Sequence, residues 1–531
     1  MCYNLSIDEN DVGRITGRSV MQLELRVPYG AEASLGEILV GETEGTGQEF
    51  LLRVTDLLHG AETAIPDWAQ RVAGSMMRLD RENAKYDLHD REERLYQQAV
   101  TTPLGFIDRA DGRPRLRKPK TLPPQFSKIR RLTDQDLEFL AAYEQDLRIG
   151  QIRSGSHVIP HAVGIHGRYL PHHIGVFATT GMGKSNLMKS FAASIMQSRR
   201  YGMLILDPHG EYYDGGAGVL PDGRKLQGLS HLADSADRLL VYSSRALPGP
   251  YNQLKVSAAE ITIADLKAVY SFSQAQEECL WALNSLFGET WLLDLASSTP
   301  EELSVHFGSK FHEMTLAVLK RRAEQVLRFD VLHADPNVTV TAGILRALED
   351  AKVVLVDTSS LWEPEELLVS AVLARSVFKR NKEKYKRPDE FHATPPVLIA
   401  VEEAQRVLQR REGEVTVFAQ IAREGRKFKT GLCAVTQQPK LIPEELLSQF
   451  NTFFILGLAD ERDREILAGS AKQDISAIVR EVQTLEPGEA IIASPNVPFA
   501  VPARVDLFED LLARQAVNNG VKVAAGPKAF Y

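Results

Sequence analysis

The chain carries the sequence Ala178-Thr179-Thr180-Gly181-Met182-Gly183-Lys184-Ser185. An apolar run, Ile174–Phe177, precedes these residues, and a segment with helical periodicity, Asn186–Phe191, follows them. A phosphate-binding P-loop requires this order of strand, glycine-rich turn and helix. The alternative is a glycine-rich connection between a strand and a helix that binds no ligand.

The residue types in this turn suit the binding of a nucleotide. Gly181 and Gly183 let backbone N–H groups converge on phosphate oxygens, and the following helix adds the positive end of its dipole. Lys184 is expected to reach the β- and γ-phosphates of ATP, and Ser185 to hold Mg²⁺. Ala178 replaces the first glycine of the usual pattern, and a positive φ there would cost energy. The residues predicted to contact the nucleotide are Thr180, Gly181, Met182, Gly183, Lys184, Ser185 and Asn186.

A second apolar run, Val397–Val401, ends in the adjacent acids Glu402 and Glu403. At such a strand end the first acid normally orients Mg²⁺ through water, and the second polarises the attacking water. We therefore predict that Glu402 belongs to the Mg²⁺ site and that Glu403 is the catalytic carboxylate. Aspartate is usual at the first position, so the longer Glu402 must fold back or act through an additional water. A strand that simply ends in surface carboxylates is the alternative.

Two further strand ends carry polar residues that suit the same site. Asp207 and Glu211 follow an apolar run, and parallel sheets gather ligand groups at the C-termini of their strands. We predict that Asp207 is a nucleotide-site residue and that both acids organise metal or water; a turn held by the Asp207 carboxylate is the alternative. Gln437 ends another strand, where its amide is placed to read the γ-phosphate, and an ordinary strand-end turn competes with this interpretation.

The stretch Ile421–Lys429 packs four cations into a helix end. Arg423 and Arg426 are predicted to supply an arginine finger to the nucleotide of a neighbouring subunit. In ring ATPases the loss of such a contact costs on the order of 10³ in rate. The alternative is a solvated basic helix end, which the helix dipole itself favours.

Apolar runs of β type alternate with helical segments from about Leu147 onwards. Continuous apolar strands are typical of a parallel sheet covered on both faces, which predicts an α/β fold. Between Ile261 and about Leu332 the β runs stop and helical periodicity takes over, so we expect a helical insertion in that sheet. Short strands in the first sixty residues, among them Ser19–Val27, predict a small β-barrel.

The 531 residues suffice for about three units. We expect a β-barrel in 1–65, a helical segment and linker in 66–146, an ATPase core in 147–255 and 336–485, a helical insertion in 256–335, and a C-terminal strand and tail in 486–531. The linker is assigned to Arg113–Arg131, which holds eight Lys/Arg residues, four prolines and no acid. Such a stretch is solvated, or it contacts nucleic acid.

The composition, 44% hydrophobic and 25% charged residues, is that of a globular protein. No apolar run reaches the roughly 18 residues that cross a bilayer, and the N-terminus lacks the features of a secretory signal. Three scattered cysteines do not suit a disulfide framework or a zinc site, so we expect a cytoplasmic protein with reduced thiols. The net charge of −8 leaves DNA binding open, because a ring needs positive charge only along its bore. Arg224 and Lys225 are candidate bore residues, or else part of an ordinary surface loop.

Together these motifs resemble the HerA family of hexameric DNA translocases, which are related to FtsK. Val12–Ile15 looks like the start of the family's N-terminal barrel, and Leu485–Ile492 looks like its C-terminal strand region. His172-His173 departs from the family, in which Arg-His is common at this place. The matching stretches, in the family's order, are Thr179–Asn186, Asp207–Tyr212, Glu402–Arg406, Ala422–Lys427 and Thr436–Pro439.

The resemblance implies a RecA-like ATPase core, a homohexamer that hydrolyses ATP between subunits, and duplex DNA in the pore. It also implies a partner on the barrel face: a NurA-like nuclease in DNA-end processing, or a nuclease or sirtuin-like effector in anti-phage defence. The leading hypothesis is an ATP-driven translocase of double-stranded DNA. The alternative is a nucleotide-gated hexameric scaffold that activates an effector with little translocation, which the departures at Ala178, Glu402 and His172 favour.

Overall fold

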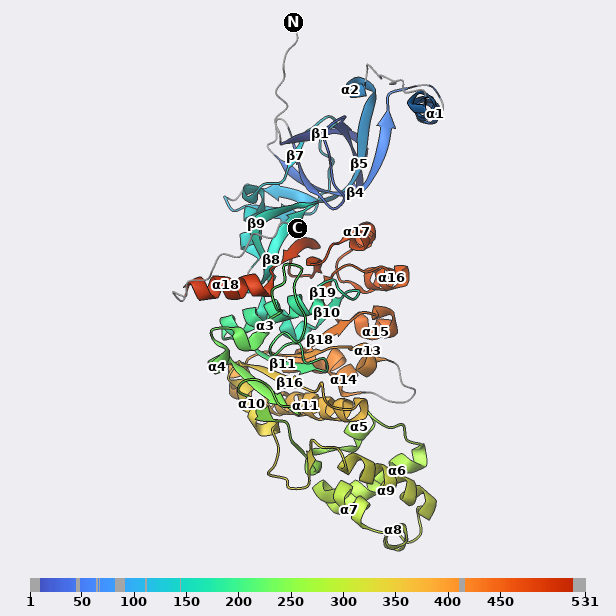
Figure 1. Cartoon of the computed structure of the whole chain (residues 1–531), viewed down its shortest axis with the longest axis vertical. Coiled ribbons are helices and arrows are strands. Elements are labelled where there is room, and N and C mark those ends of the chain that lie inside the picture. Colours follow the sequence, from blue (N-terminus) through green and yellow to red (C-terminus); the bar gives the residue numbers. More distant parts are fainter. Residues whose placement is uncertain are drawn as a thin grey trace.

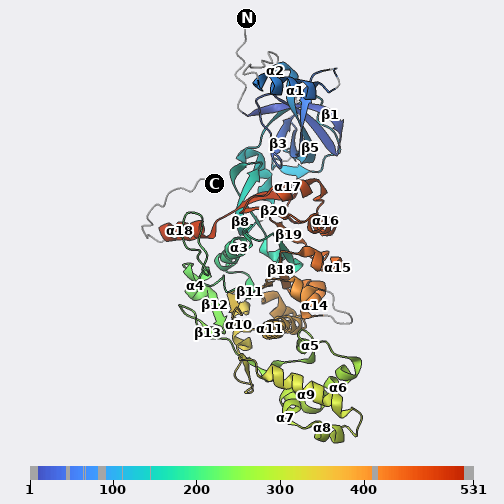
Figure 2. The same cartoon turned by 45° about the vertical axis from the view of Figure 1, so that its right-hand side comes forward.

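The computed structural model describes residues 10–43, 48–63, 65, 67–81, 91–109, 112–143, 145–409 and 416–518. Figure 1 shows an elongated molecule in three parts: an antiparallel sheet at one end, a large sheet with helices on both faces in the middle, and a helical lobe at the other end. Figure 2 shows the same order after a rotation of 45°. Cys2 falls outside the described residues, whereas Cys279 and Cys433 are buried free thiols.

A twelve-stranded sheet forms the middle of the molecule, and β10 (Ile174–Phe177), the strand before the P-loop, lies inside it. From β13 (Asn252–Gln253) to β19 (Thr452–Ile455) neighbouring strands pair in parallel, and from β19 to β9 (His157–Ile165) they pair antiparallel. This sheet confirms the predicted α/β class with a RecA-like P-loop core. Its order is β13 (Asn252–Gln253), β12 (Leu239–Ser243), β16 (Val353–Asp357), β11 (Gly202–Asp207), β17 (Val397–Val401), β18 (Thr430–Thr436), β10, β19 (Thr452–Ile455), β20 (Glu489–Ala493), β21 (Val501–Val505), β8 (Leu147–Ser154) and β9 (His157–Ile165).

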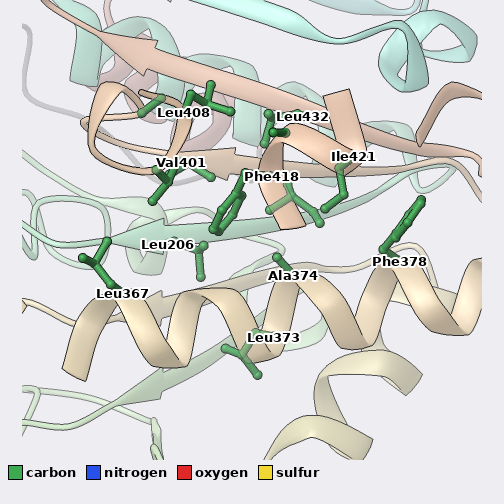
Figure 3. Close-up of a cluster of buried hydrophobic side chains, with 14 of the residues drawn as sticks. Leu206, Leu367, Leu373, Ala374, Phe378, Val401, Leu408, Phe418, Ile421 and Leu432 are labelled. Atoms are coloured by element: carbon green, nitrogen blue, oxygen red, sulfur yellow. The ribbon is translucent and has the colours of Figure 1, made fainter. Parts of the chain in front are cut away.

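Alternate side chains of the parallel strands enter two separate cores. In β10, Ile174 and Val176 join the core that includes α3 (Lys184–Ser198), whereas Phe177 joins the core that includes α11 (Glu363–Lys384). Because both faces are covered, each strand reads as an unbroken apolar run. Figure 3 shows part of the second core, to which β11, β17, β18, α11 and α14 (Val417–Glu424) contribute Leu206, Leu367, Ala374, Phe378, Val401, Phe418, Ile421 and Leu432.

The predicted helical insertion is present as the lobe at the lower end of Figure 1. β14 (Val256–Ser257) and β15 (Leu332–His333) pair where the chain enters and leaves it. Thr299 caps α8 (Pro300–His306), and Pro300 takes the first position of that helix, which is where both residue types stabilise a helix. The helices of the lobe are α5 (Ile263–Leu266), α6 (Gln274–Phe287), α7 (Trp291–Ser297), α8 (Pro300–His306) and α9 (Glu313–Leu327).

The N-terminal sheet closes on itself. Its order is β2-β1-β7-β3-β4-β5-β6, and an additional pairing between β2 and β5 completes a ring of six strands. Closure removes the unpaired edges that an open antiparallel sheet would expose. The strands are β1 (Asp11–Ser19), β2 (Gln22–Pro28), β3 (Ile38–Glu42), β4 (Glu49–Ala61), β5 (Leu95–Asp108), β6 (Arg115–Arg117) and β7 (Lys128–Arg131).

The structure corrects two expectations for this region. The strand predicted at Ser19–Val27 is interrupted by a turn between β1 and β2. More importantly, the barrel does not end at residue 65, because β5, β6 and β7 belong to it. Only α1 (Trp68–Arg81) and the short α2 (Arg91–Arg94) are α-helices within the described part of 66–146.

The basic stretch Arg113–Arg131 is therefore not a linker throughout. Its last residues form β7, which pairs with β1 and β3. Arg130 shows why the stretch is basic: its guanidinium bonds Asp136 at 2.7 Å, Glu42 at 2.6 Å and Glu49 at 3.0 Å. The positive charge at this position is matched by acids of the same chain.

A hydrophobic core continues from the barrel into the ATPase core. Ile38 and Val40 of β3 and Leu51 of β4 belong to the same buried cluster as Ile149 of β8 and Val176 of β10. Separating the two parts would expose this shared apolar surface, which costs about 25 cal/mol per Å². The barrel and the ATPase core therefore form one packed body.

A buried group of charges crosses the same junction. Glu481 of α17 (Val479–Thr484) accepts hydrogen bonds from Arg53 of β4 (Nε–Oε2 2.9 Å) and Arg153 of β8 (Nη2–Oε1 2.5 Å). Arg53 and Glu481 are only 1% and 2% exposed. Burial lowers the pKa of Arg53, and the charge of Glu481 opposes this shift. Gly36 must remain glycine, because it has a φ of +76° and a Cβ there would lie 2.3 Å from the Glu481 carboxyl carbon.

None of the helices in the described ranges is long and apolar enough to cross a membrane.

Replacing Glu481 by glutamine is expected to lower the free energy of unfolding by about 3–5 kcal/mol, because two buried arginines lose the charge that compensates them. The unfolding midpoint in urea measures this loss. Glu486→Gln, an exposed substitution five residues further along, serves as the control and is expected to stay within about 0.5 kcal/mol of the unsubstituted chain. Equal midpoints for the two variants would contradict the role given to Glu481.

Candidate nucleotide-binding site

The P-loop lies at the C-terminal end of β10 and leads directly into α3. Gly181 has a φ of +84° and Gly183 a φ of +95°, conformations that favour glycine. Ala178 is fully buried and does not have a positive φ, so the alanine at this position causes no backbone strain. The departure from the usual pattern is therefore compatible with an ordinary P-loop.

Lys184 lies among carboxylates. Burial lowers the pKa of Lys184, while the charges of Glu402, Glu403 and Glu211 raise it. Its Nζ lies 3.5 Å from the carbonyl oxygen of Ala178, within the loop itself. These acids and the Ser185 hydroxyl are oxygen donors of the kind that Mg²⁺ prefers, and Lys184 supplies a cation for phosphate. The residues present therefore fit ATP with Mg²⁺.

Asp207 builds a turn. Its carboxylate accepts the backbone N–H groups of His209 at 3.1 Å, Gly210 at 2.8 Å and Tyr212 at 3.0 Å. Burial raises the pKa of Asp207 to about 6, and these hydrogen bonds oppose the shift. The alternative interpretation, a turn held by this side chain, is thus what the structure shows. The side chain that the turn directs to the P-loop is Glu211, which accepts a hydrogen bond from Ser185 Oγ at 2.8 Å.

Glu402 folds inward. It accepts a short hydrogen bond from the hydroxyl of Tyr212, a residue that is 2% exposed. Burial raises the pKa of Glu402 to about 7, and the neighbouring Asp207 and Glu403 contribute to the shift. Burial and the charge of Glu402 also raise the pKa of Tyr212 well above its ordinary value, so the phenol stays protonated and donates.

Glu403 is held by two amides. Its backbone has a φ of +49°, which is strained for a residue with a side chain. The carboxylate accepts hydrogen bonds from Gln405 Nε2 at 2.5 Å and from Gln437 Nε2 at 3.3 Å. Gln437 Oε1 in turn accepts a short hydrogen bond from the hydroxyl of Thr180 in the P-loop. The structure therefore brings together Thr180, Gln437 and Glu403 as the sequence predicted.

Gln405 was missed among the candidate residues. Thr436 Oγ1 donates to Gln405 Oε1 at 2.5 Å, which fixes the amide so that its nitrogen faces Glu403. The available signal was its position two residues after Glu403, the predicted catalytic carboxylate. A polar residue so close to Glu403 is placed to orient it.

Two of the predicted P-loop residues face the C-terminal segment. The Asn186 side chain donates to the carbonyl oxygen of Asp506 at 3.1 Å and accepts from the N–H of Phe508 at 2.9 Å. The carbonyl oxygen of Met182 accepts the N–H of Gly488 at 3.2 Å. The Asn186 side chain thus bonds the backbone of Asp506 and Phe508, and its contact with nucleotide stays a prediction.

Arg423 and Arg426 lie at the other edge of the sheet. They precede β18, whereas Gln437 follows it, and seven residues of strand at about 3.3 Å each separate the two edges by about 20 Å. Both arginines are exposed, and Arg423 contacts Glu445 at 3.2 Å. Arg426 is close enough to His172 to contribute, after burial, to the lowered pKa of that imidazole. The structure therefore does not bring these arginines to the P-loop of their own chain.

Arg224 is paired within the chain. Its guanidinium bonds Asp222 at 2.6 Å and Asp510 at 3.3 Å, while the neighbouring Lys225 is exposed. If Arg224 lined the bore of a ring, its guanidinium would have to leave Asp222 and Asp510 to bind a DNA phosphate.

The middle part of this chain matches a model of a known protein family. The family model described as "Helicase HerA, central domain" matches residues 147–377. The chain is similar to "DNA double-strand break repair helicase HerA" of Sulfurisphaera tokodaii, with 28% identity over 78% of this chain and 79% of the relative. The protein of the same name from Sulfolobus acidocaldarius is 27% identical over 79% of this chain and 80% of its own.

Among solved structures, the plasmid coupling protein TrwB in complex with the non-hydrolysable ATP analogue ADPNP is similar at a TM-score of 0.44 and 13% identity. The alignment covers 71% of this chain and 92% of that chain. The family match and the two relatives confirm the resemblance to the HerA family that the motifs indicate. The expected class of enzyme, an ATPase, is confirmed with it.

The raised pKa of Glu402 predicts how pH affects the protein without nucleotide or Mg²⁺. Because the folded chain holds this proton up to about pH 7 and the unfolded chain releases it near 4.5, stability falls as pH rises through that window. Glu402→Gln removes the titration, so the variant should be more stable than the unsubstituted chain at pH 8, by about 1–3 kcal/mol. At pH 4, below the unfolded pKa of 4.5, the difference should nearly vanish. Thermal unfolding at both pH values measures it, and a difference independent of pH would contradict the prediction.

Proposed function

We propose that this chain, which resembles the HerA helicases over most of its length, is an ATP-driven translocase of double-stranded DNA that works as a homohexameric ring. In this role Lys184 and the P-loop N–H groups bind the phosphates of ATP, and Glu403 polarises the attacking water. Gln437 reads the γ-phosphate, because its amide lies between Thr180 of the P-loop and Glu403. Bound Mg²⁺ supplies charge stabilisation at the phosphate oxygens.

The observation that supports a ring is the position of the arginines. Every other catalytic group lies at the C-terminal edge of the parallel strands, and Arg426 lies at the N-terminal edge of the same sheet. An arginine about 20 Å away cannot complete its own site, but the edge of a second copy can present it there. Arg426 and Arg423 therefore act on the nucleotide of the neighbouring subunit. His172, next to Arg426, occupies the place where relatives of this family commonly have a second arginine.

DNA is held through its phosphates. The net charge of −8 places no general positive field on the surface, so binding depends on local cations along the bore. Lys225 is one such candidate, and Arg224 joins it only after releasing Asp222 and Asp510. Contacts of this kind are independent of base sequence and weaken steeply with salt.

The partner is proposed to dock on the N-terminal barrel. A NurA-like nuclease would couple translocation to DNA-end processing, and a nuclease or sirtuin-like effector would couple it to anti-phage defence. The shared core between barrel and ATPase domain supports this placement, because a partner bound to the barrel is joined rigidly to the motor. The work is expected to take place in the cytoplasm.

A scaffold is the second candidate function, in which the ring assembles and activates an effector with little translocation. Two departures favour it: Glu402, whose carboxylate is engaged by Tyr212, and His172. Ala178 does not favour the scaffold, because its φ is not positive and its backbone is unstrained. Glu403→Gln separates the two functions in cells, since a motor loses all function and a scaffold retains effector assembly and activity.

Linear duplex DNA is expected to stimulate ATP turnover at 50 mM salt, and most of the stimulation should be lost at 200 mM, because ring contacts are to phosphates. Turnover of the purified chain with and without DNA measures this. Glu403→Gln should reduce the rate by about 10²–10⁴-fold while leaving nucleotide binding intact. Turnover that is negligible or indifferent to DNA in the unsubstituted chain would contradict the translocase and favour the scaffold.

Mixing two inactive variants tests the arginine in trans. Arg426→Ala is expected to lower turnover on the order of 10³-fold, and Glu403→Gln is inactive for a different reason. In mixed rings some interfaces combine an intact Glu403 with an intact Arg426 from the neighbour, so part of the activity should return. Two Glu403→Gln preparations mixed together provide the matched control. If mixed rings form and no activity returns, the arginine does not act across the interface.

A further inference from the structure

The turn at the end of β11 directs two neighbouring side chains to different parts of the nucleotide site. Asp207, fully buried, fixes the turn by accepting three backbone N–H groups. Gly210 has a φ of +70°, and a Cβ there would lie 2.7 Å from Arg245 Nη2 and 2.8 Å from Ser359 Oγ. The backbone is therefore held from both sides, which makes the directions of the next two side chains a fixed property of the fold.

Glu211 is the side chain on the P-loop side. Ser185 Oγ, the hydroxyl expected to hold Mg²⁺, donates to Glu211 Oε2 at 2.8 Å. The charge of Glu211 also acts on Lys184, together with those of Glu402 and Glu403. Glu211 is exposed, and it contacts Ser185, the P-loop side chain predicted to hold the metal.

Tyr212 is the side chain on the other side. Its buried hydroxyl donates to the carboxylate of Glu402, the acid that the strand pattern assigns to the metal. Glu402 is longer than the usual aspartate, and its carboxylate is folded back against this phenol. No hydrogen bond joins Glu402 to Ser185 among the described residues, whereas Glu211 makes one.

We propose that Glu211 is the carboxylate that orders the water ligands of Mg²⁺ beside Ser185, and that Tyr212 withholds Glu402 from this task. The inference rests on the proposed ATPase function and reassigns one role within it. Mg²⁺ keeps several of its waters and takes few protein ligands, so the carboxylate nearest the liganding hydroxyl accepts hydrogen bonds from those waters. Ser185 Oγ donates to Glu211 in this structure, and the hydroxyl must leave the carboxylate to bind the metal.

A Mg²⁺ titration of nucleotide binding tests the assignment. Binding of a fluorescent ATP analogue is measured for the unsubstituted chain, Glu211→Gln and Glu402→Gln as Mg²⁺ is added. In a parallel series Mn²⁺ replaces Mg²⁺, and electron paramagnetic resonance measures the bound Mn²⁺. Loss of an outer partner of a metal ligand costs about 10–100-fold in metal affinity. Glu211→Gln should therefore raise the half-maximal Mg²⁺ concentration about tenfold or more, and Glu402→Gln should change it by less than about twofold. Glu313→Gln, on the exposed surface of α9, is the control.

Both substitutions preserve side-chain size, and a glutamine at 402 still accepts from Tyr212, so the variants are expected to fold. The assignment is overturned if Glu402→Gln has the larger effect or if the two effects are equal. Absence of nucleotide binding by the unsubstituted chain at any Mg²⁺ concentration would instead overturn the ATPase function itself. The two failures are therefore distinguishable in one experiment.

Discussion

The parallel pairing of β10, β11, β17 and β18 is the constraint on which the candidate site depends. Parallel neighbours end at the same edge of a sheet, so the P-loop, the turn at Asp207, the acids after Val401 and Gln437 are brought together although they span more than 250 residues of sequence. Each strand is buried on both faces, and this packing fixes its register relative to the neighbouring strand. Small polar groups at four strand ends can then meet within hydrogen-bonding distance.

That arrangement places several carboxylates around one lysine. Glu211, Glu402 and Glu403 all act on Lys184, and burial disfavours the charged form of Glu402 in particular. The charges of these acids repel one another, and the charge of Lys184 offsets part of this repulsion. A divalent cation bound beside these acids would relieve the repulsion among them.

The sequence predicted the parts of the site that are local. The P-loop, the paired acids and Gln437 can each be recognised from residue types that directly follow an apolar run. The structure places them close together. The barrel boundary was wrong because β5 pairs with β2 and β4 over long separations that composition does not reveal, and because the cations of β7 find acids in other strands. Asp207 and Glu211 could not be told apart from sequence, since the role of each depends on the direction in which one turn points its side chains.

The junction between barrel and ATPase core has a mechanical consequence. Ile38, Val40 and Leu51 pack into the core of the ATPase sheet, and Glu481 lies between two arginines, so these described contacts resist bending between the two parts. Any tilt of the ATPase core carries the barrel through the same angle, and the displacement grows with distance from the pivot. The long hairpin of β4 and β5, which reaches the far end of the molecule with α1 at its tip, therefore sweeps the widest arc (Figure 1). A barrel joined rigidly in this way would enlarge a small tilt of the ATPase core.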